Sequence, residues 1–138
     1  YIAEAVALAE ANRVALGLSN VRFLQSDWFA ALSAAQYQLI VSNPPYIDPD
    51  DPHLLEGDVR FEPRSALVAA DKGMADLKHI ISLAPGYLAE GGVLLLEHGF
   101  QQAAAVREVL SERGFSSIES RRDYGGNERI SWGVWRNE

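Results

Sequence analysis

The residues with the clearest chemical potential form the tetrapeptide Asn43-Pro44-Pro45-Tyr46. Neither proline has an N–H group, so the tetrapeptide offers two acceptors, the side-chain oxygen of Asn43 and the carbonyl oxygen of Pro44. These acceptors match the two hydrogens of an NH2 group. Accepting both hydrogens pushes electron density onto the nitrogen and fixes its direction of attack, and Tyr46 can pack on a flat substrate group. The tetrapeptide is therefore predicted to hold a planar amide or amine nitrogen as a nucleophile.

The prolines also stiffen this segment. A residue before proline is restricted to extended conformations, and Pro44 and Pro45 each have a fixed φ, so the Asn43 side chain is aimed by a rigid backbone. Asn43 cannot act as a base, so a proton should leave the nitrogen for solvent after the nitrogen has reacted. The alternative is a proline-stiffened surface turn without chemistry. The position of the tetrapeptide after an apolar strand and before a long loop favours the functional interpretation.

Hydrophobic periodicity predicts the elements that must position the tetrapeptide. Helices are expected over residues 2–16, 74–89 and 100–113, and strands over 21–24, 37–42, 93–96, 115–120 and 130–135. Gly17 and Gly114 stand where helix caps belong, and Pro85 should kink or divide the second helix. Consecutive apolar residues in strands 37–42 and 93–96 predict burial on both faces.

Alternation of strands and helices predicts an α/β sheet with helices on both faces. Only the turn at residues 124–127 joins the last two strands, so the sheet should be parallel with one antiparallel strand at its end. Asn43 follows a strand directly, which places it at the carboxyl edge, where such sheets bind ligands. Residues 43–63 hold five of the six prolines and are expected to form a long ordered loop.

Composition narrows the classes of function. The chain has 138 residues, 48% of them hydrophobic, which fits one domain. Its net charge of −7 argues against nucleic acid as a partner, and Arg121, Arg122 and Arg129 are interpreted as a solvated rim. There is no cysteine, no metal site is expected, and no apolar run is long enough for a membrane span. A cytoplasmic location without membrane contact is therefore expected.

Several motifs together resemble one family, the release-factor glutamine N5-methyltransferases, and the resemblance extends over the whole chain. The motifs are Gln25-Ser26-Asp27-Trp28, Val41-Ser42-Asn43-Pro44-Pro45-Tyr46-Ile47, Gly57-Asp58-Val59-Arg60-Phe61-Glu62-Pro63, Ala66-Leu67-Val68-Ala69, Gly73-Met74-Ala75-Asp76, Leu95-Leu96-Glu97-His98-Gly99 and Asp123-Tyr124-Gly125. Asn-Pro-Pro-Tyr alone is shared with amino-adenine methyltransferases, whereas the combination is specific.

The resemblance implies methyl transfer from S-adenosylmethionine to the glutamine amide in the Gly-Gly-Gln loop of peptide-chain release factors. Asn43, Pro44 and Tyr46 would be the catalytic residues, with Pro45 completing the substrate site. The cofactor would be held by Asn43 and, at its adenine end, by Asp27 and Trp28. Without the resemblance, Trp28 would be interpreted as a core residue at least as readily, and Asp27 as a helix N-cap.

The implied fold is the α/β, Rossmann-like class I S-adenosylmethionine-dependent methyltransferase fold, with a mostly parallel sheet and one antiparallel strand. The chain corresponds to the C-terminal portion of that single catalytic domain. The family's glycine-rich cofactor loop, its ribose-binding acidic residue, two N-terminal strands and a helical N-terminal domain are missing from the sequence and are expected before Tyr1. The 138 residues alone are therefore expected neither to bind the cofactor usefully nor to fold with full stability.

Two other functions remain open. An amino-adenine N6-methyltransferase acting on nucleic acid could use the same tetrapeptide, although base flipping requires basic grooves that this acidic chain lacks. A non-catalytic fragment could retain a surface for release factors without the cofactor loop. His98, beside Glu97, is interpreted as a capping or solvent-facing residue because amide methylation needs no base before transfer. Arg60 and Glu62 are interpreted as an ion pair within the long loop.

Overall fold

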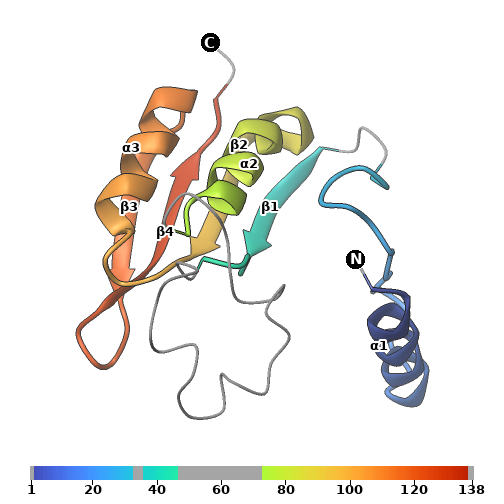
Figure 1. Ribbon diagram of the computed structural model, residues 1–138. Coiled ribbons are helices and arrows are strands. Elements are labelled where there is room, and N and C mark those ends of the chain that lie inside the picture. The colour runs from blue at the N-terminus through green and yellow to red at the C-terminus, as the bar shows by residue number, and fades with distance from the viewer. Residues whose placement is uncertain (1, 33–35, 47–72, 137–138) are drawn as a thin grey trace. The chain divides into compact units, whose positions relative to one another are not determined.

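The computed structural model describes residues 2–32, 36–46 and 73–136 (Figure 1). These residues form two compact units, one within residues 1–35 and the other within residues 36–138, and each is described by itself. The predicted loop at residues 43–63, with Arg60 and Glu62, lies outside the described residues after Tyr46. The prediction of a single domain stays a prediction.

The first unit contains helix α1, Ala3–Ala15. Its end is as predicted: Gly17 has a φ of +67°, and the N–H of Leu18 donates to the carbonyl of Arg13 at 3.1 Å. A residue in this left-handed conformation commonly ends a helix, and glycine adopts it without steric cost. The strand predicted at residues 21–24 is wrong, because this segment is described without strand structure. Apolar and β-branched residues become a strand only when a neighbouring strand pairs with their backbone.

The second unit is built on a four-stranded sheet in the order β1-β2-β4-β3. Its strands are β1, Tyr37–Ser42; β2, Leu88–Glu97; β3, Ser116–Arg122; and β4, Glu128–Val134. Strand β1 pairs with β2 in parallel, whereas β4 is antiparallel to both of its neighbours. The α/β class with one antiparallel strand is thus confirmed. The prediction that the antiparallel strand lies at the end of the sheet is wrong. After the tight turn that follows β3, strand β4 lies between β2 and β3, so β3 is the edge strand.

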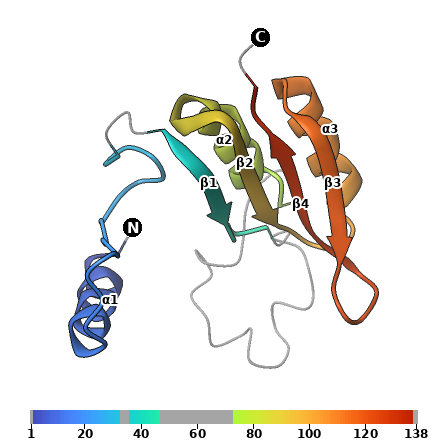
Figure 2. The ribbon, with the colours of Figure 1, turned by 180° about the vertical axis from the view of Figure 1, so that it is seen from behind.

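Helices α2, Ala75–Leu83, and α3, Ala103–Arg113, lie on the same face of this sheet (Figures 1 and 2). The core lies between them and the sheet, and it includes Leu77, Ile80, Ile81, Leu94, Leu96, Val106 and Leu110. Along β2, Leu94 and Leu96 are buried, whereas their neighbours Val93 and Leu95 are partly exposed. Among the described residues of this unit, the helices therefore cover one face of the sheet.

The prediction that residues 37–42 and 93–96 are buried on both faces is consequently wrong. Leu39 and Val41 of β1 are 56% and 63% exposed. They pair with Val93 and Leu95, the partly exposed residues of β2, and β1 is an edge strand of the described sheet. A run of apolar residues signals that both faces can be buried, but whether they are depends on the elements that cover them.

Glycine and proline set the boundaries of the helices in this unit. Helix α2 ends at Leu83, and a 3-10 turn, Ala84–Tyr87, contains Pro85. The division predicted at Pro85 is therefore confirmed, although strand β2 already begins at Leu88, where a helix was expected to continue. Gly114, with a φ of +109°, ends α3 as predicted. None of the described helices has the length and apolarity needed to cross a bilayer.

Candidate active site

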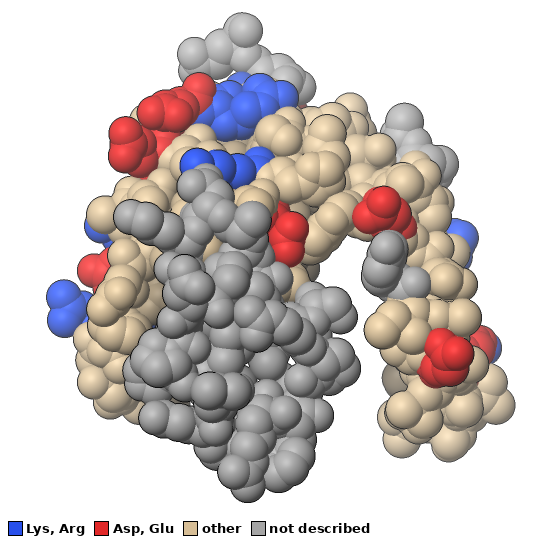
Figure 3. Space-filling view, in the orientation of Figure 1, with Lys and Arg blue, Asp and Glu red and all other residues tan. Residues whose placement is uncertain are grey.

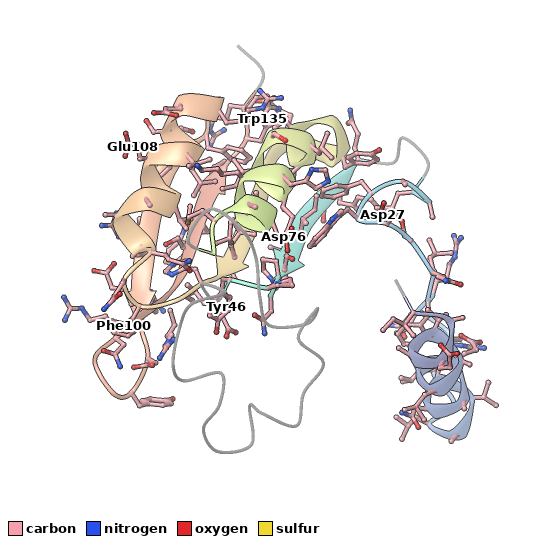
Figure 4. The ribbon with its side chains drawn as sticks, in the orientation of Figure 1. Asp27, Tyr46, Asp76, Phe100, Glu108 and Trp135 are labelled. Carbon is pink, nitrogen blue, oxygen red and sulfur yellow. The ribbon has the colours of Figure 1, made fainter. Side chains whose placement is uncertain are left out.

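The tetrapeptide Asn43-Pro44-Pro45-Tyr46, called the Asn-Pro loop below, lies at the carboxyl edge of the sheet as predicted. It follows β1, whose last residue, Ser42, pairs with Leu96 of the parallel strand β2. Since both strands run in the same direction, the loop emerges beside the end of β2. Figure 4 shows Tyr46 at this end of the two strands.

Within the Asn-Pro loop, Asn43 is exposed and Pro44 is buried. A buried ring anchors the segment, while the preceding carboxamide remains accessible to a ligand. Burial of Asn43 in the core would have excluded contact with any substrate, and the structure does not show it. The acceptor roles of Asn43 and Pro44 remain predictions.

Tyr46 is fixed by its hydroxyl, which donates to Oε1 of Glu97 at 3.1 Å. The pKa of Tyr46 is raised above its ordinary value, first because the group is partly buried, and then by the negative charge of Glu97 and the hydrogen bond to it. The nearby guanidinium of Arg129 opposes this rise in pKa. The phenol therefore keeps its proton at neutral pH and acts as a donor. Packing of the Tyr46 ring on a flat substrate stays a prediction.

The backbone carbonyl of Tyr46 is held from another direction. Nε2 of Gln102 donates to this carbonyl at 2.8 Å, and Oε1 of the same side chain accepts from the N–H of Gly99 at 2.8 Å. Gly73 packs against the same carbonyl, since a Cβ at this position would stand 1.9 Å from the Tyr46 oxygen. Sequence reasoning assigned no role to Gln102 or Gly73, and only the motifs around Gly99 and Gly73 pointed to this region.

His98 follows β2 and is fully buried, so the predicted capping or solvent-facing role is wrong. Its Nδ1 lies 2.9 Å from the carbonyl of Gly99, and its Nε2 lies 2.7 Å from Oγ of Ser131. A carbonyl can only accept, so Nδ1 carries the proton and Nε2 accepts from Ser131. The pKa of His98 is lowered, mainly because burial disfavours its charged form. His98 is thus a neutral, buried structural residue just after the end of β2.

A hydrogen-bond chain continues from this histidine to the surface. Oγ of Ser131 lies 2.6 Å from Oγ of Ser120, which accepts from Nη1 of Arg107 at 2.7 Å. The same nitrogen donates to Oε2 of Glu128 at 2.8 Å. Because Ser131 gives its proton to His98, Ser120 must donate to Ser131, so the bonds from Arg107 through the two serines all point toward His98. The polar interior behind the Asn-Pro loop is therefore satisfied and ordered.

Asp27 and Trp28 belong to the first unit, and the structure does not place them relative to Asn43. Both are exposed, and Trp28 has a φ of +55°, which is uncommon for a bulky residue. Oγ of Ser26 organises this turn by accepting from the N–H of Ala31 and donating to the carbonyl of Trp28, each at 2.8 Å. The side chain that caps the turn is thus Ser26 rather than Asp27. The cofactor role of Asp27 and Trp28 stays a prediction.

Two of the described arginines in the second unit pair with carboxylates. Arg129 pairs with Asp123 at 3.2 Å, and Arg107 pairs with Glu128 at 2.8 Å. Figure 3 shows acidic and basic side chains interspersed over the described part of the visible face. The expectation, drawn from the net charge, that nucleic acid is not a partner stays a prediction.

Comparison with known proteins defines the class. A family model described as the methyltransferase small domain matches residues 2–55. The crystal structure of a ribosomal protein L11 methylase from Lactobacillus delbrueckii subsp. bulgaricus has the same fold, with a TM-score of 0.64 and 16% identity over 99% of this chain and 55% of that chain. The chain therefore has the Rossmann-like α/β fold of class I methyltransferases.

The chain is also similar to curated relatives that share one name. The chain is 63% identical over 130 residues to the release factor glutamine methyltransferase of Salmonella typhimurium, covering 94% of this chain and 47% of the relative. It is 56% identical over 134 residues to the enzyme of that name from Pseudomonas aeruginosa, covering 97% of this chain and 49% of the relative. The resemblance to release factor glutamine methyltransferases is thus confirmed, and the chain spans about half the length of these relatives.

Proposed function

We propose that this chain is the C-terminal portion of the catalytic domain of a methyltransferase that transfers a methyl group from S-adenosylmethionine to the side-chain amide of a release-factor glutamine, within a Gly-Gly-Gln motif. The observation that supports this function best is the exposed Asn43 at the carboxyl edge of the sheet, on a loop whose far end is fixed through Tyr46. The names of the relatives supply the substrate. The peptide-chain release factor would be a cytoplasmic protein partner.

The Asn-Pro loop would perform the positioning in this reaction. The Asn43 side-chain oxygen and the Pro44 carbonyl accept the two hydrogens of the glutamine NH2 group, which orients the nitrogen and increases its electron density. The new bond joins this nitrogen to the methyl carbon, and the methyl–sulfur bond breaks. The nitrogen then loses one proton to solvent, since Asn43 has no basic group. The protonated Tyr46 keeps its hydroxyl on Glu97 throughout.

The residues present fit part of a cofactor site. An exposed indole and a neighbouring carboxylate, Trp28 and Asp27, are the groups expected around an adenine ring and its amino group. Asn43 would lie near the amino acid end of the cofactor. S-Adenosylmethionine would supply an electrophilic methyl group on a sulfonium. The residues of the chain hold, orient and shield the substrate, and no residue needs to be covalently modified.

The test uses an extended protein in which a glycine-rich cofactor loop precedes residue 1. This protein is incubated with methyl-labelled S-adenosylmethionine and a release factor, and the labelled residue is located by mass spectrometry. Label on the Gly-Gly-Gln glutamine is expected. Label on an adenine base of added nucleic acid would instead favour the amino-adenine enzyme. Binding of release factor with no label on either substrate would favour the non-catalytic fragment.

Asn43→Ala is the matching variant. Loss of one preorganised polar contact should cost about 2 to 4 kcal/mol in transition-state stabilisation, a decrease of about 30-fold to 10³-fold in kcat/KM. Gln38→Ala is the control, because it removes an exposed side-chain amide from β1, the strand that leads to the site. Undiminished turnover by the Asn43→Ala enzyme would contradict the role of this residue.

A further inference from the structure

We propose that Gln102 is a positioning residue for the methylation reaction: its side-chain amide fixes the Asn-Pro loop, and with it the two acceptors for the substrate nitrogen. This inference rests on the proposed function. Its side-chain amide bonds to the carbonyl of Tyr46 and to the N–H of Gly99, so it is expected to act on the two acceptor groups through Tyr46. Both polar atoms of its side-chain amide, Oε1 and Nε2, form these hydrogen bonds.

The geometry makes Gln102 a clamp between two segments that are distant in the sequence. Nε2 donates to the carbonyl of Tyr46, which ends the Asn-Pro loop, and Oε1 accepts from the N–H of Gly99, which follows β2. Both bonds are 2.8 Å long. A carboxamide presents a donor and an acceptor side by side, so it matches a carbonyl and an N–H in one orientation only. A flipped amide would face an acceptor with an acceptor and a donor with a donor.

Gln102 is itself held in place by helix α3. Gln102 precedes α3 as its N-cap, with its carbonyl accepting from the N–H of Val106 at 2.9 Å. Its own N–H donates to the carbonyl of Gly99 at 2.9 Å. Helix α3 is anchored in the core by Ala103, Val106 and Leu110. The backbone of Gln102 therefore has little freedom, and its amide is directed at Tyr46 by the packing of the helix.

Fixing Tyr46 fixes the acceptors that precede it. At its start, the Asn-Pro loop is tied to the sheet, because Ser42 pairs with Leu96. At its end, the carbonyl of Tyr46 is held by Gln102 and its hydroxyl by Glu97. Between these ties lie two residues with fixed φ. The loop is thus restrained at both ends and stiff in the middle, which is the preorganisation that orientation of a weak nucleophile requires.

The alternative is that Gln102 has only a structural role and stabilises the fold. The two possibilities differ in what a substitution changes. A stabilising residue lowers the free energy of unfolding and the fraction of folded enzyme, whereas a positioning residue lowers kcat in enzyme that is fully folded. A misplacement of about 1 Å can reduce a rate by about 10²-fold even when it originates away from the reacting atoms.

Gln102→Met tests the proposal in the extended protein with a release factor as substrate. Methionine has a similar length but neither hydrogen-bonding group. Its kcat is expected to fall by about 10-fold to 10²-fold, with KM for S-adenosylmethionine changed less than about threefold. Gln101→Met is the matched control, since the adjacent Gln101 is exposed. A kcat within about twofold of wild type for fully folded Gln102→Met enzyme would overturn the proposal.

Gln102→Glu supplies a readout that a purely structural role would not move. The ionised carboxylate can still accept from Gly99 but repels the carbonyl of Tyr46, whereas the protonated acid has both an acceptor and a donor and restores both bonds. The ratio of its kcat to that of wild type should therefore rise at least about fivefold as the pH is lowered from about 8 to about 5.5, toward the range where a carboxyl protonates. A ratio independent of pH would contradict the clamp.

A measurement without turnover separates failure of this inference from failure of the proposed function. The Gly99 N–H donates to Gln102, so Gln102→Met should increase its hydrogen-exchange rate by about 10-fold or more, while Gln101→Met should not. If wild-type enzyme fails to methylate release factors, the proposed function fails, and the exchange rate alone decides whether the clamp exists. Unchanged exchange at Gly99 would refute the clamp whatever the substrate.

Discussion

Gly73→Ala should disrupt the site by displacing the carbonyl of Tyr46. A Cβ at residue 73 would stand 1.9 Å from the Tyr46 oxygen and 2.6 Å from Nε2 of Gln102, whereas ordinary contacts begin at 3.4 Å. Either the carbonyl or residue 73 must therefore move by about 1.5 Å. A shift of this size breaks the bond between Gln102 and Tyr46 and turns the Asn-Pro loop.

Two contributions to the loss of stability in Gly73→Ala can be separated. Gly73 has a φ of +85°, and an alanine in this left-handed region costs about 1 to 2 kcal/mol. Loss of the hydrogen bond adds about 1 kcal/mol. We therefore expect the free energy of unfolding to fall by about 2 to 3 kcal/mol, and kcat in the extended protein to fall by about 10²-fold.

Gly126→Ala is the matched control. Gly126 has a φ of +83°, almost the same as that of Gly73, but nothing lies within 4 Å of a Cβ built there. It should lose only the backbone contribution and keep its turnover. Denaturant titration and steady-state methylation of a release factor measure the two quantities for both variants. A Gly73→Ala enzyme as active and as stable as Gly126→Ala would refute the close packing on which the argument depends.

The remaining predictions concern the buried histidine and the tyrosine of the site. Because burial lowers the pKa of His98, the unfolded chain binds its proton more readily, and the free energy of unfolding should decrease as the pH falls below about 6.5, by at most about 1.4 kcal/mol per pH unit. His98→Gln should flatten this dependence in denaturant titrations, and an unchanged slope would exclude His98 as its source. Ser131→Ala leaves Nε2 of His98 buried without a donor and should cost about 1 to 3 kcal/mol, whereas the exposed Ser116→Ala should cost less than about 0.5 kcal/mol. Equal midpoints for the two serine variants would contradict a stabilising hydrogen bond from Ser131 to His98. Tyr46→Phe removes the 3.1 Å bond to Glu97 and should reduce kcat by about 3-fold to 10-fold, while the fully exposed Tyr124→Phe should not change it. A Tyr46→Phe enzyme with wild-type kcat would show that the hydroxyl does not help to place the loop.

Local signals in the sequence predicted much of the fold. The ends of α1 and α3 follow from Gly17 and Gly114, whose positive φ angles the structure confirms. The antiparallel pairing of β3 and β4 follows from the short connection between them, which Asp123 stabilises by accepting from the N–H of Asn127 at 3.0 Å. These features depend on residues close together in the sequence, so a local pattern suffices.

The errors arise where the outcome depends on distant elements. The apolar run that contains Leu39 and Val41 is typical of a strand buried on both faces. The helices described in this unit cover only one face of the sheet, and these two side chains are exposed. The position of Asn43 at the carboxyl edge was predictable, because it requires only a strand that ends there. The bond from Gln102 to Tyr46 was not, because it joins residues separated by 56 positions. A glycine such as Gly73 indicates a close approach but not its partner.

The direction of β4 has a practical consequence. This strand runs opposite to β1, so Trp135 reaches the far end of the sheet, where its N–H and carbonyl bond to the backbone of Gly92 and Gly91, each at 2.8 Å. Figure 4 labels Trp135 there, at the end away from Tyr46. An affinity tag, fluorophore or surface tether joined after this tryptophan would thus lie at the end of the sheet opposite the Asn-Pro loop, so that the loop stays accessible in immobilised protein.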